Sequence, residues 1–210
     1  MEFHEQTIDS FLELLSSKAA VPGGGGASAL VGSVAASLSH MVAALTVGKA
    51  KYADVEGEMQ GVLAESERIT KRFLSLMDED ASAFTPLAEA YRLPKDTPEQ
   101  ITARTKIMEA ALRTAVEPPL RIMEVCGEAL ELIAVCAEKG SVMAVSDAGV
   151  AATLCRAALE GASLNVFINT QPMTDREYAE RLNFRAKHML AEYGTRAEEL
   201  YKKVYAKLGA

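Results

Sequence analysis

Cysteine is scarce in this sequence, and its scarcity excludes two ways of stabilising a fold. Only three cysteines occur, Cys126, Cys136 and Cys155. An odd number without a paired C-x-x-C motif suits neither a disulfide framework nor a zinc site. We therefore expect three small, buried thiols in a reducing compartment, and no visible set of ligands requires a metal ion.

Basic charge is scarce as well. Lys and Arg total 22 against 29 Asp and Glu, so the formal net charge is −7. Nucleic-acid binding requires a clustered excess of Lys and Arg, which this sequence lacks. The N-terminus carries Glu2, Glu5 and Asp9 where a secretory signal has a basic and then an apolar region. We expect a cytoplasmic protein that binds no nucleic acid.

The common catalytic motifs are missing too. No G-x-x-x-x-G-K-[ST] loop occurs, and the glycine run does not follow a predicted strand, as a dinucleotide-binding loop would. H-E-x-x-H and G-x-S-x-G are absent. The three histidines, His4, His40 and His188, are isolated in sequence, which is typical of surface or hydrogen-bonded core positions.

Helical patterns are abundant by contrast. With 210 residues, of which 49% are hydrophobic and 24% charged, and no evident linker, the chain is expected to be a single domain over residues 1–210. Strand signals are nearly absent, "SLNVFIN" being the one stretch that allows a strand. We predict an all-α bundle of six to nine helices, over about Glu5–Ser17, Gly25–Val47, Val55–Tyr91, Thr97–Val116, Glu117–Lys139, Ser141–Asn169 and Thr174–Leu208.

Several helix ends have recognisable start and stop residues. Thr97 with Gln100, and Thr174 with Glu177, fit capping boxes. Gly140 suits a C-terminal cap, and Gly48 a break. Pro86 allows a kink, and we expect the Ser141–Asn169 helix to be interrupted at Gly149 or Gly161.

The segment Ala19–Gly48 contains no Asp, Glu, Lys or Arg and is long enough to cross a bilayer. It is mostly Ala, Gly, Ser and Val, and we see no second span of that quality for it to pair with. A helix that is apolar all round is either a membrane span or a core helix, and we favour the core helix. Its small residues suit close packing in a bundle or at a dimer interface.

Four glycines, Gly23 to Gly26, precede this helix. A helix N-terminus offers unpaired N–H groups and a favourable dipole to an anion or a polar ring edge, and glycines let a ligand approach the backbone. A tight turn between packed helices needs only one or two glycines. The run therefore favours a binding loop.

Three stretches carry a family resemblance: "PGGGGASALVGSVAASLSHMVAALTVGKAKY", "DEDASAFTPLAEAYRLPKDT" and "SDAGVAATLCRAALEGASLNVFIN". They resemble the cyclodeaminase/cyclohydrolase family, which includes the C-terminal half of formiminotransferase-cyclodeaminase and stand-alone bacterial enzymes. The likeness runs from about Phe3 to Leu208. It implies an all-helical, dimer-forming fold acting on tetrahydrofolate, either by ammonia-releasing closure of the 5-formimino compound or by hydrolysis of 5,10-methenyltetrahydrofolate.

Gly26 departs from the pattern of many cyclodeaminases, which have a serine after three glycines. Together with "SDAGV" and "GASLNVFIN", this favours the methenyltetrahydrofolate cyclohydrolases. Folate then enters as substrate and no fixed cofactor is implied. A non-catalytic helical module that binds folate or another small anion is the alternative from a different class.

Hydrolysis of a cationic methenyl carbon calls for a carboxylate that stabilises the cation and accepts the proton of the attacking water. Asp147 is our first candidate, because it lies in the otherwise uncharged "AVSDAGVAA". A helix N-cap formed by Ser146 or Asp147 is the structural alternative. Asp80 is the second candidate. The resemblance favours it over its acidic neighbours, for which a solvated turn is the simpler interpretation.

Candidate substrate-binding residues surround these carboxylates. Lys49 ends the uncharged helix, where it either complements the helix dipole or binds a folate carboxylate. Asn165 and Asn169, four residues apart, project from one face and suit the donors and acceptors of a pterin edge. The full predicted set is Gly23, Gly24, Gly25, Gly26, Ser28, Lys49, Ser146, Asn165 and Asn169.

Spacing limits any single pocket. Asp147 and Asn165 are 18 residues apart, about 27 Å along an unbroken helix, and Ser28 and Lys49 are separated by about 31 Å on the same basis. If these residues share one site, either the helices break, or the ligand is long, or a second protomer contributes some of the residues. We predict a homodimer with its site at or near the interface.

Overall fold

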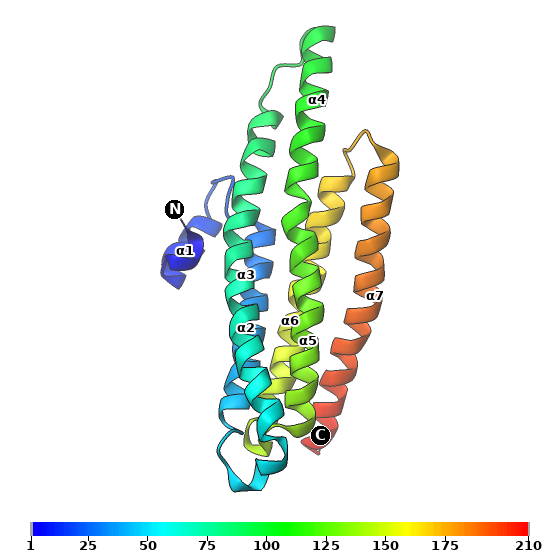
Figure 1. Ribbon diagram of the computed structural model, residues 1–210. Coiled ribbons are helices and arrows are strands. Elements are labelled where there is room, and N and C mark those ends of the chain that lie inside the picture. The colour runs from blue at the N-terminus through cyan, green and yellow to red at the C-terminus, as the bar shows by residue number, and fades with distance from the viewer. Residues whose placement is uncertain (1, 210) are drawn as a thin grey trace.

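The computed structural model describes residues 2–209, and within them every regular element is helical. The long helices run alternately up and down the bundle, with α5 continuing the direction of α4 (Figure 1). The prediction of an all-α protein with six to nine helices is confirmed. The elements are η1 (Phe3–Glu5), α1 (Ile8–Leu15), α2 (Gly24–Ala44), η2 (Ala50–Val55), α3 (Glu56–Tyr91), α4 (Pro98–Ala115), α5 (Glu117–Lys139), η3 (Val142–Ala144), α6 (Val145–Thr170) and α7 (Arg176–Lys207).

Local sequence fixes several helix ends as predicted. Thr97 accepts from the Gln100 N–H, and the Gln100 side chain accepts from the Thr97 N–H, which completes the capping box of α4. α5 restarts at Glu117, directly after α4. Gly140 caps α5. α2 ends at Ala44, before the predicted Val47, and Gly48 follows it with a positive φ of 76°.

Other predicted ends are wrong. The first α-helix begins at Ile8, because Thr7 caps it by accepting from the Ser10 N–H. The cap of α7 is Asp175, which accepts from the Tyr178 N–H. The predicted cap, Thr174, instead donates both its N–H and its hydroxyl to Glu109 of α4.

The predicted interruption of α6 is also wrong, since one helix runs from Val145 to Thr170 and includes "SLNVFIN". Its glycines serve packing. A Cβ at Gly149 would lie 2.8 Å from Val204 of α7, and a Cβ at Gly161 would lie 2.5 Å from the Ser28 hydroxyl of α2. α3 likewise continues through Pro86.

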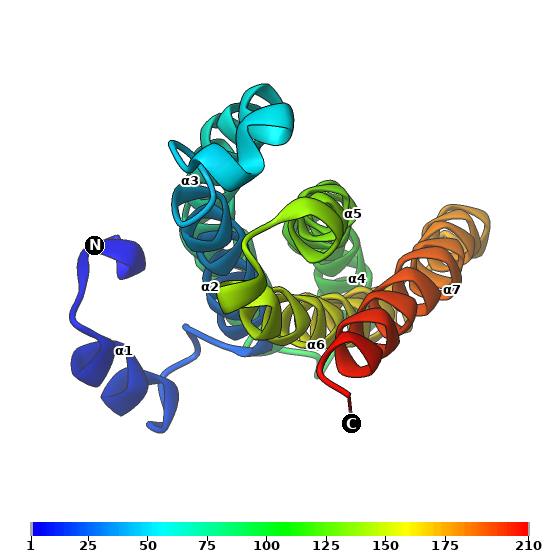
Figure 2. The same ribbon diagram turned by 90° about the horizontal axis from the view of Figure 1, so that it is seen from below.

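α2 and α6 lie side by side at one edge of the bundle and run antiparallel (Figures 1 and 2). Their small residues permit close approach, since Gly161 of α6 leaves the space that the Ser28 hydroxyl of α2 occupies. On the other side of α2, Phe73 of α3 fills the space beside Gly32. The three cysteines are free and buried in the core. α1 lies on the outer side of α2, together with η1 and the segment that joins α1 to α2 (Figure 2).

Two segments are long and apolar enough to span a membrane by length and composition alone, Gly24–Ala44 and Val142–Thr170. The expectation that no second such segment follows α2 is therefore wrong. Core helices pass the same test, and half of the window in α2 and 44% of that in the second segment are buried in the bundle. The two segments pack against each other through their small residues.

Candidate active site at the N-terminus of α2

The first turn of α2 is capped by a side chain from another helix. Gly23 precedes the helix and has no side chain to cap it. The Gly26 N–H instead donates to Oδ2 of Asp80 in α3, at 3.0 Å. Gly25 makes room for this contact, because a Cβ at that position would overlap the Asp80 carboxylate. Two of the four glycines therefore serve to bring one carboxylate onto the helix end.

Asp80 has a perturbed acidity. Burial raises the pKa of its carboxyl to about 6, and the hydrogen bond from the Gly26 N–H opposes this rise without cancelling it. A carboxylate with a pKa near 6 is basic enough to accept a proton at neutral pH and acidic enough to return it. Of the two predicted catalytic carboxylates, Asp80 is the one that lies in a cavity.

That cavity has a volume of about 120 Å³ and lies between α2, α3, the C-terminus of α4 and the end of α6. Asn165 and Asn169 both line it, as their spacing predicts. The Asn165 Nδ2 donates to the Gly161 carbonyl and the Asn169 Nδ2 donates to the Ala115 carbonyl. Both amides are thus held in place by the backbone, and each keeps its oxygen as an acceptor.

The glycine run departs from the predicted bare backbone surface. Asn165 lies 3.1 Å from where a Cβ of Gly24 would be, so a side chain of the protein stands close to this glycine, although Gly24 itself is exposed. Only Gly23 has open space around it. A Cβ at Gly26 would make an ordinary contact of 3.7 Å with Pro22, so its side-chain space admits a larger residue. Ser28 is buried and donates to the Gly24 carbonyl, which makes it part of the helix packing.

The remaining predicted residues lie at the opposite end of the α2/α6 pair. Thr46, just after α2, accepts from the Ser141 N–H just before α6, which places Lys49 and the start of α6 near each other. Lys49 and Ser146 are exposed, and Asp147 is half-buried in the first turn of α6. Because α6 is unbroken, Asp147 and Asn165 are about 27 Å apart, and one chain does not bring Asp147 to Asp80.

Some lining residues were not predicted from the sequence. Phe84 lies one turn after Asp80 on α3, a spacing that places both side chains on one helix face. Ala115, Ile168 and the segment Ala20–Val21 also line the cavity. Phe84 was detectable from its spacing to Asp80, whereas nothing local marks an alanine or an isoleucine as a cavity residue.

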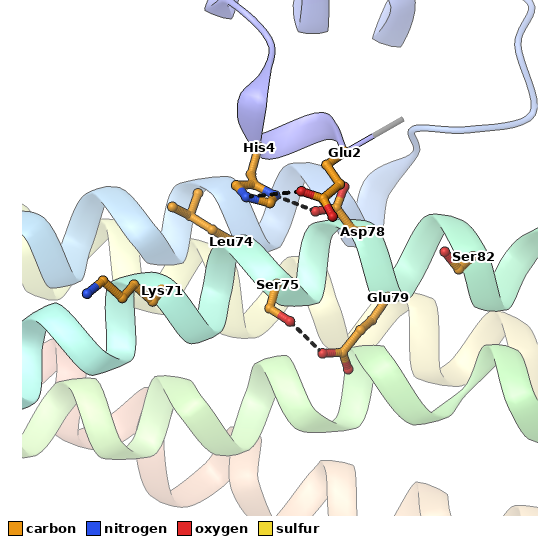
Figure 3. A pocket seen from close by; sticks show the side chains of 8 residues that line it. All are labelled: Glu2, His4, Lys71, Leu74, Ser75, Asp78, Glu79 and Ser82. Carbon is orange, nitrogen blue, oxygen red and sulfur yellow. Dashed lines mark hydrogen bonds and ion pairs between the residues drawn. The ribbon is translucent and has the colours of Figure 1, made fainter.

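A second cavity, of about 370 Å³, lies on α3 beneath η1 (Figure 3). The His4 Nδ1 is 2.5 Å from Asp78 Oδ2, and the Phe3 N–H donates to the other oxygen of Asp78. The hydrogen bond with Asp78 raises the pKa of His4. Glu2, His4 and Glu5 are close enough to share an ion, but all three are exposed and the carboxylate of Asp78 anchors the imidazole. This cluster attaches η1 to α3.

The other two histidines have partners that agree with their predicted structural roles. The His40 ring nitrogen Nδ1 lies 3.2 Å from both the Leu63 carbonyl and the Ser66 hydroxyl. His188 lies 3.5 Å from Glu192, one turn further along α7. Neither histidine lines the cavity at Asp80.

Comparison with known proteins places this geometry in context. Residues 7–188 match the model of the family described as Formiminotransferase-cyclodeaminase. A Methylorubrum extorquens protein named methenyltetrahydrofolate cyclohydrolase is 40% identical, and the match covers 97% of this chain and 98% of that one. The rat formimidoyltransferase-cyclodeaminase is 31% identical over 92% of this chain, which spans 36% of the rat protein. The crystal structure of formiminotetrahydrofolate cyclodeaminase from Thermotoga maritima superposes with a TM-score of 0.80 at 27% identity, and the superposition covers 97% of this chain and 96% of that one.

Proposed function

This chain belongs to the formiminotransferase-cyclodeaminase family, and from that premise we propose that it is a methenyltetrahydrofolate cyclohydrolase. The reaction is hydrolysis of 5,10-methenyltetrahydrofolate to 10-formyltetrahydrofolate. The observation that carries the proposal is the end-to-end likeness to a protein of that name, at 40% identity. Folate is then the substrate, and the reaction requires no fixed cofactor.

Asp80 is suited to the proton transfers of this hydrolysis. Water adds to the cationic carbon between N5 and N10 while the carboxylate of Asp80 accepts one of its protons. The tetrahedral adduct then collapses. The bond from carbon to N5 breaks, the protonated Asp80 returns its proton to N5, and the hydroxyl proton of the adduct leaves to solvent as the formyl group forms on N10. A pKa of about 6 allows Asp80 to perform both transfers near neutral pH.

In this proposal, Asn165 and Asn169, which both line the cavity, orient the pterin ring. Their amide nitrogens donate to backbone carbonyls, so their oxygens remain available to accept from ring N–H groups. An orienting role predicts that their loss raises KM and lowers kcat together, because a misplaced ring misaligns the reacting carbon.

Cyclodeaminase activity is the second candidate, because the solved structure that superposes on this chain carries that name. Ring closure of 5-formiminotetrahydrofolate with release of ammonia passes through a similar tetrahedral carbon. Asp80 would there protonate the departing nitrogen. The same site thus serves either reaction, and the substrate offered decides between them.

The experiment that tests the function uses purified protein and both folates. Loss of the near-ultraviolet absorbance of 5,10-methenyltetrahydrofolate, faster than in buffer alone and abolished by Asp80→Asn, supports the hydrolase. Appearance of that absorbance together with ammonia from 5-formiminotetrahydrofolate selects the deaminase. Binding without turnover of either compound would refute both and leave a folate-binding module.

We also propose that the protein is a homodimer whose sites combine the two ends of the α2/α6 pair. The outer side of this pair exposes apolar side chains in series, among them Val34 at 44% and Leu164 at 68%. Antiparallel packing of two such faces about a two-fold axis would bring the Asp147 end of one copy to the Asp80 end of the other. The free, buried cysteines support a cytoplasmic location for this assembly.

Complementation tests the shared site. Asp80→Asn and Asp147→Asn protomers are each inactive if both residues act, but a mixed dimer retains one site with both carboxylates. After unfolding and refolding together in equal amounts, random pairing should restore about a quarter of wild-type activity. Activity that stays at the level of the two separate variants would exclude a site shared in this way.

A further inference from the structure

Arg104 is a half-buried cation with an unsatisfied donor. Its Nε is buried and has no hydrogen-bond partner within residues 2–209. Other arginines of this acidic protein are paired, for example Arg68 with Glu128 and Arg113 with Asp175. A buried guanidinium nitrogen without an acceptor is uncommon, because an unmade bond to a charged group is costly. The described chain therefore leaves the Arg104 Nε–H free to donate to a group from outside it.

The inner face of α4 leads from Arg104 to the cavity at Asp80. Residues 104, 108, 111 and 115 follow the spacing of one helix face. Ala111 and Ala115 are buried and Met108 packs against the core, and Ala115 lines the cavity. Arg104 lies eleven residues before Ala115, which is about 16 Å along the helix.

The helices α3 and α4 extend beyond the first turn of α2 (Figure 1). Ala115, which lines the cavity, is the last residue of α4, and Arg104 lies in the part of α4 that leads away from it. Phe84 lines the cavity four residues after Asp80, about 6 Å further towards the α3/α4 turn. Asp80, Phe84 and Arg104 are thus met in that order along the axis. A carboxylate comes first, then an aromatic ring, and then a cation.

A reduced folate has its parts in a matching order. The one-carbon unit bridges N5 and N10, a benzoyl ring follows, and a glutamate with two carboxylates ends the molecule. On the basis of the proposed function, we propose that Arg104 binds the glutamate carboxylates of the substrate, with the benzoyl ring against Phe84 and the reacting carbon at Asp80. A planar guanidinium that binds a carboxylate through two N–H groups would satisfy the buried Nε.

This assignment replaces the predicted role of Lys49. Lys49 is exposed at the far end of the α2/α6 pair, and in one chain it is out of reach of a folate bound at Asp80. A tail bound by Arg104 lies along the same chain that supplies Asp80 and Phe84. The two assignments differ in which cation confers selectivity for the glutamate.

The test compares 5,10-methenyltetrahydrofolate with 5,10-methenyltetrahydropteroate, which lacks the glutamate. Arg104→Met keeps an unbranched apolar stem and removes the guanidinium group with its charge. We expect it to raise KM for the folate by about 10- to 100-fold, as expected for loss of a charge-assisted hydrogen-bonded pair, with kcat nearly unchanged. The KM for the pteroate compound should not change. Lys106→Met is the matched control, because Lys106 lines a groove on the opposite face of α4.

Each outcome decides between the possibilities. An equal change in KM for both compounds would show that Arg104 acts only on packing. No change in either KM would show that Arg104 does not contact the substrate. Both results overturn the inference. The inference would also be overturned if the preference for the folate over the pteroate compound disappeared in Lys49→Met but persisted in Arg104→Met. If the wild-type protein hydrolyses neither compound, the proposed function fails, and calorimetric binding of the folate by wild type and Arg104→Met then tests the inference alone.

Discussion

Replacing Asp80 by Asn should stabilise the protein while it removes activity. The carboxylate is held in a site that disfavours its ionisation, since burial raises its pKa from 3.8 to about 6. Asn keeps a side-chain oxygen that accepts from the Gly26 N–H and carries no charge to desolvate. The substitution therefore relieves a cost that the folded protein bears whenever Asp80 is ionised.

The size of the effect follows from the pKa. A rise from 3.8 to about 6, at about 1.4 kcal/mol per pKa unit, corresponds to about 3 kcal/mol. Partial exposure of the side chain reduces this, so we expect a gain of about 1–3 kcal/mol at pH 8. A residue that served only as a helix cap would give the opposite sign, a loss of about 1 kcal/mol.

The free energy of unfolding of the wild-type protein should fall with rising pH for the same reason. Between about pH 4 and pH 6 the folded protein binds a proton at Asp80 that the unfolded chain has released, so this contribution to stability is lost as the pH rises through 6. Wild type and Asp80→Asn should therefore be close in stability near pH 4 and diverge up to pH 7. Above that the difference should be constant.

Urea denaturation at fixed protein concentration, repeated from pH 4.5 to pH 8, measures the difference directly. Asp54→Asn is the matched control, because Asp54 is exposed and its replacement makes the same change in net charge. A less stable Asp80→Asn protein at pH 8, or a difference that does not depend on pH, would refute the interpretation of Asp80 as a destabilised functional carboxylate.

Three further predictions concern the same helices. The wild-type kcat/KM, corrected for hydrolysis in buffer, should rise with pH up to about 6 and then level off, because Asp80 must be ionised to accept a proton; a rate that is flat from pH 5 to 7 would speak against this role. Gly25→Ala, whose Cβ overlaps the Asp80 carboxylate, should lower kcat by about tenfold or more, whereas Gly61→Ala, which meets no neighbour, should not change it in the same assay. Gly161→Ala places a Cβ 2.5 Å from the Ser28 hydroxyl and should cost about 1–3 kcal/mol, seen as a lower midpoint in denaturation; an unchanged midpoint would mean that α2 and α6 can move apart freely.

Features that depend on neighbours in the sequence were predictable. Thr97 and Gln100 form a capping box from residues three apart, and Pro118 follows the restart of α5, so the pattern alone locates these ends. The spacing of Asn165 and Asn169 correctly predicts that they share a helix face. The family resemblance rests on motifs of this local kind.

Features that depend on distant contacts were not predictable. Thr174 looks like a cap but is drawn away by Glu109, 65 residues earlier. Gly149 looks like a helix break but is the space that Val204 occupies. Gly25 looks like open backbone but is covered by Asp80. In each case a contact with a residue distant in the sequence overrides a local preference. A single sequence does not show which distant residue will make that contact.

The cap on α2 connects the integrity of the site to hydrogen exchange. An ordinary N-cap is a neighbour in sequence and moves with the turn when the turn unwinds. Here the acceptor is 54 residues away on another helix, so the Gly26 amide proton is released to solvent only when α2 and α3 separate at that point. The hydrogen-exchange rate of the Gly26 amide therefore reports the fraction of molecules in which the Asp80 carboxylate has left the helix end, and no substrate is needed for the measurement.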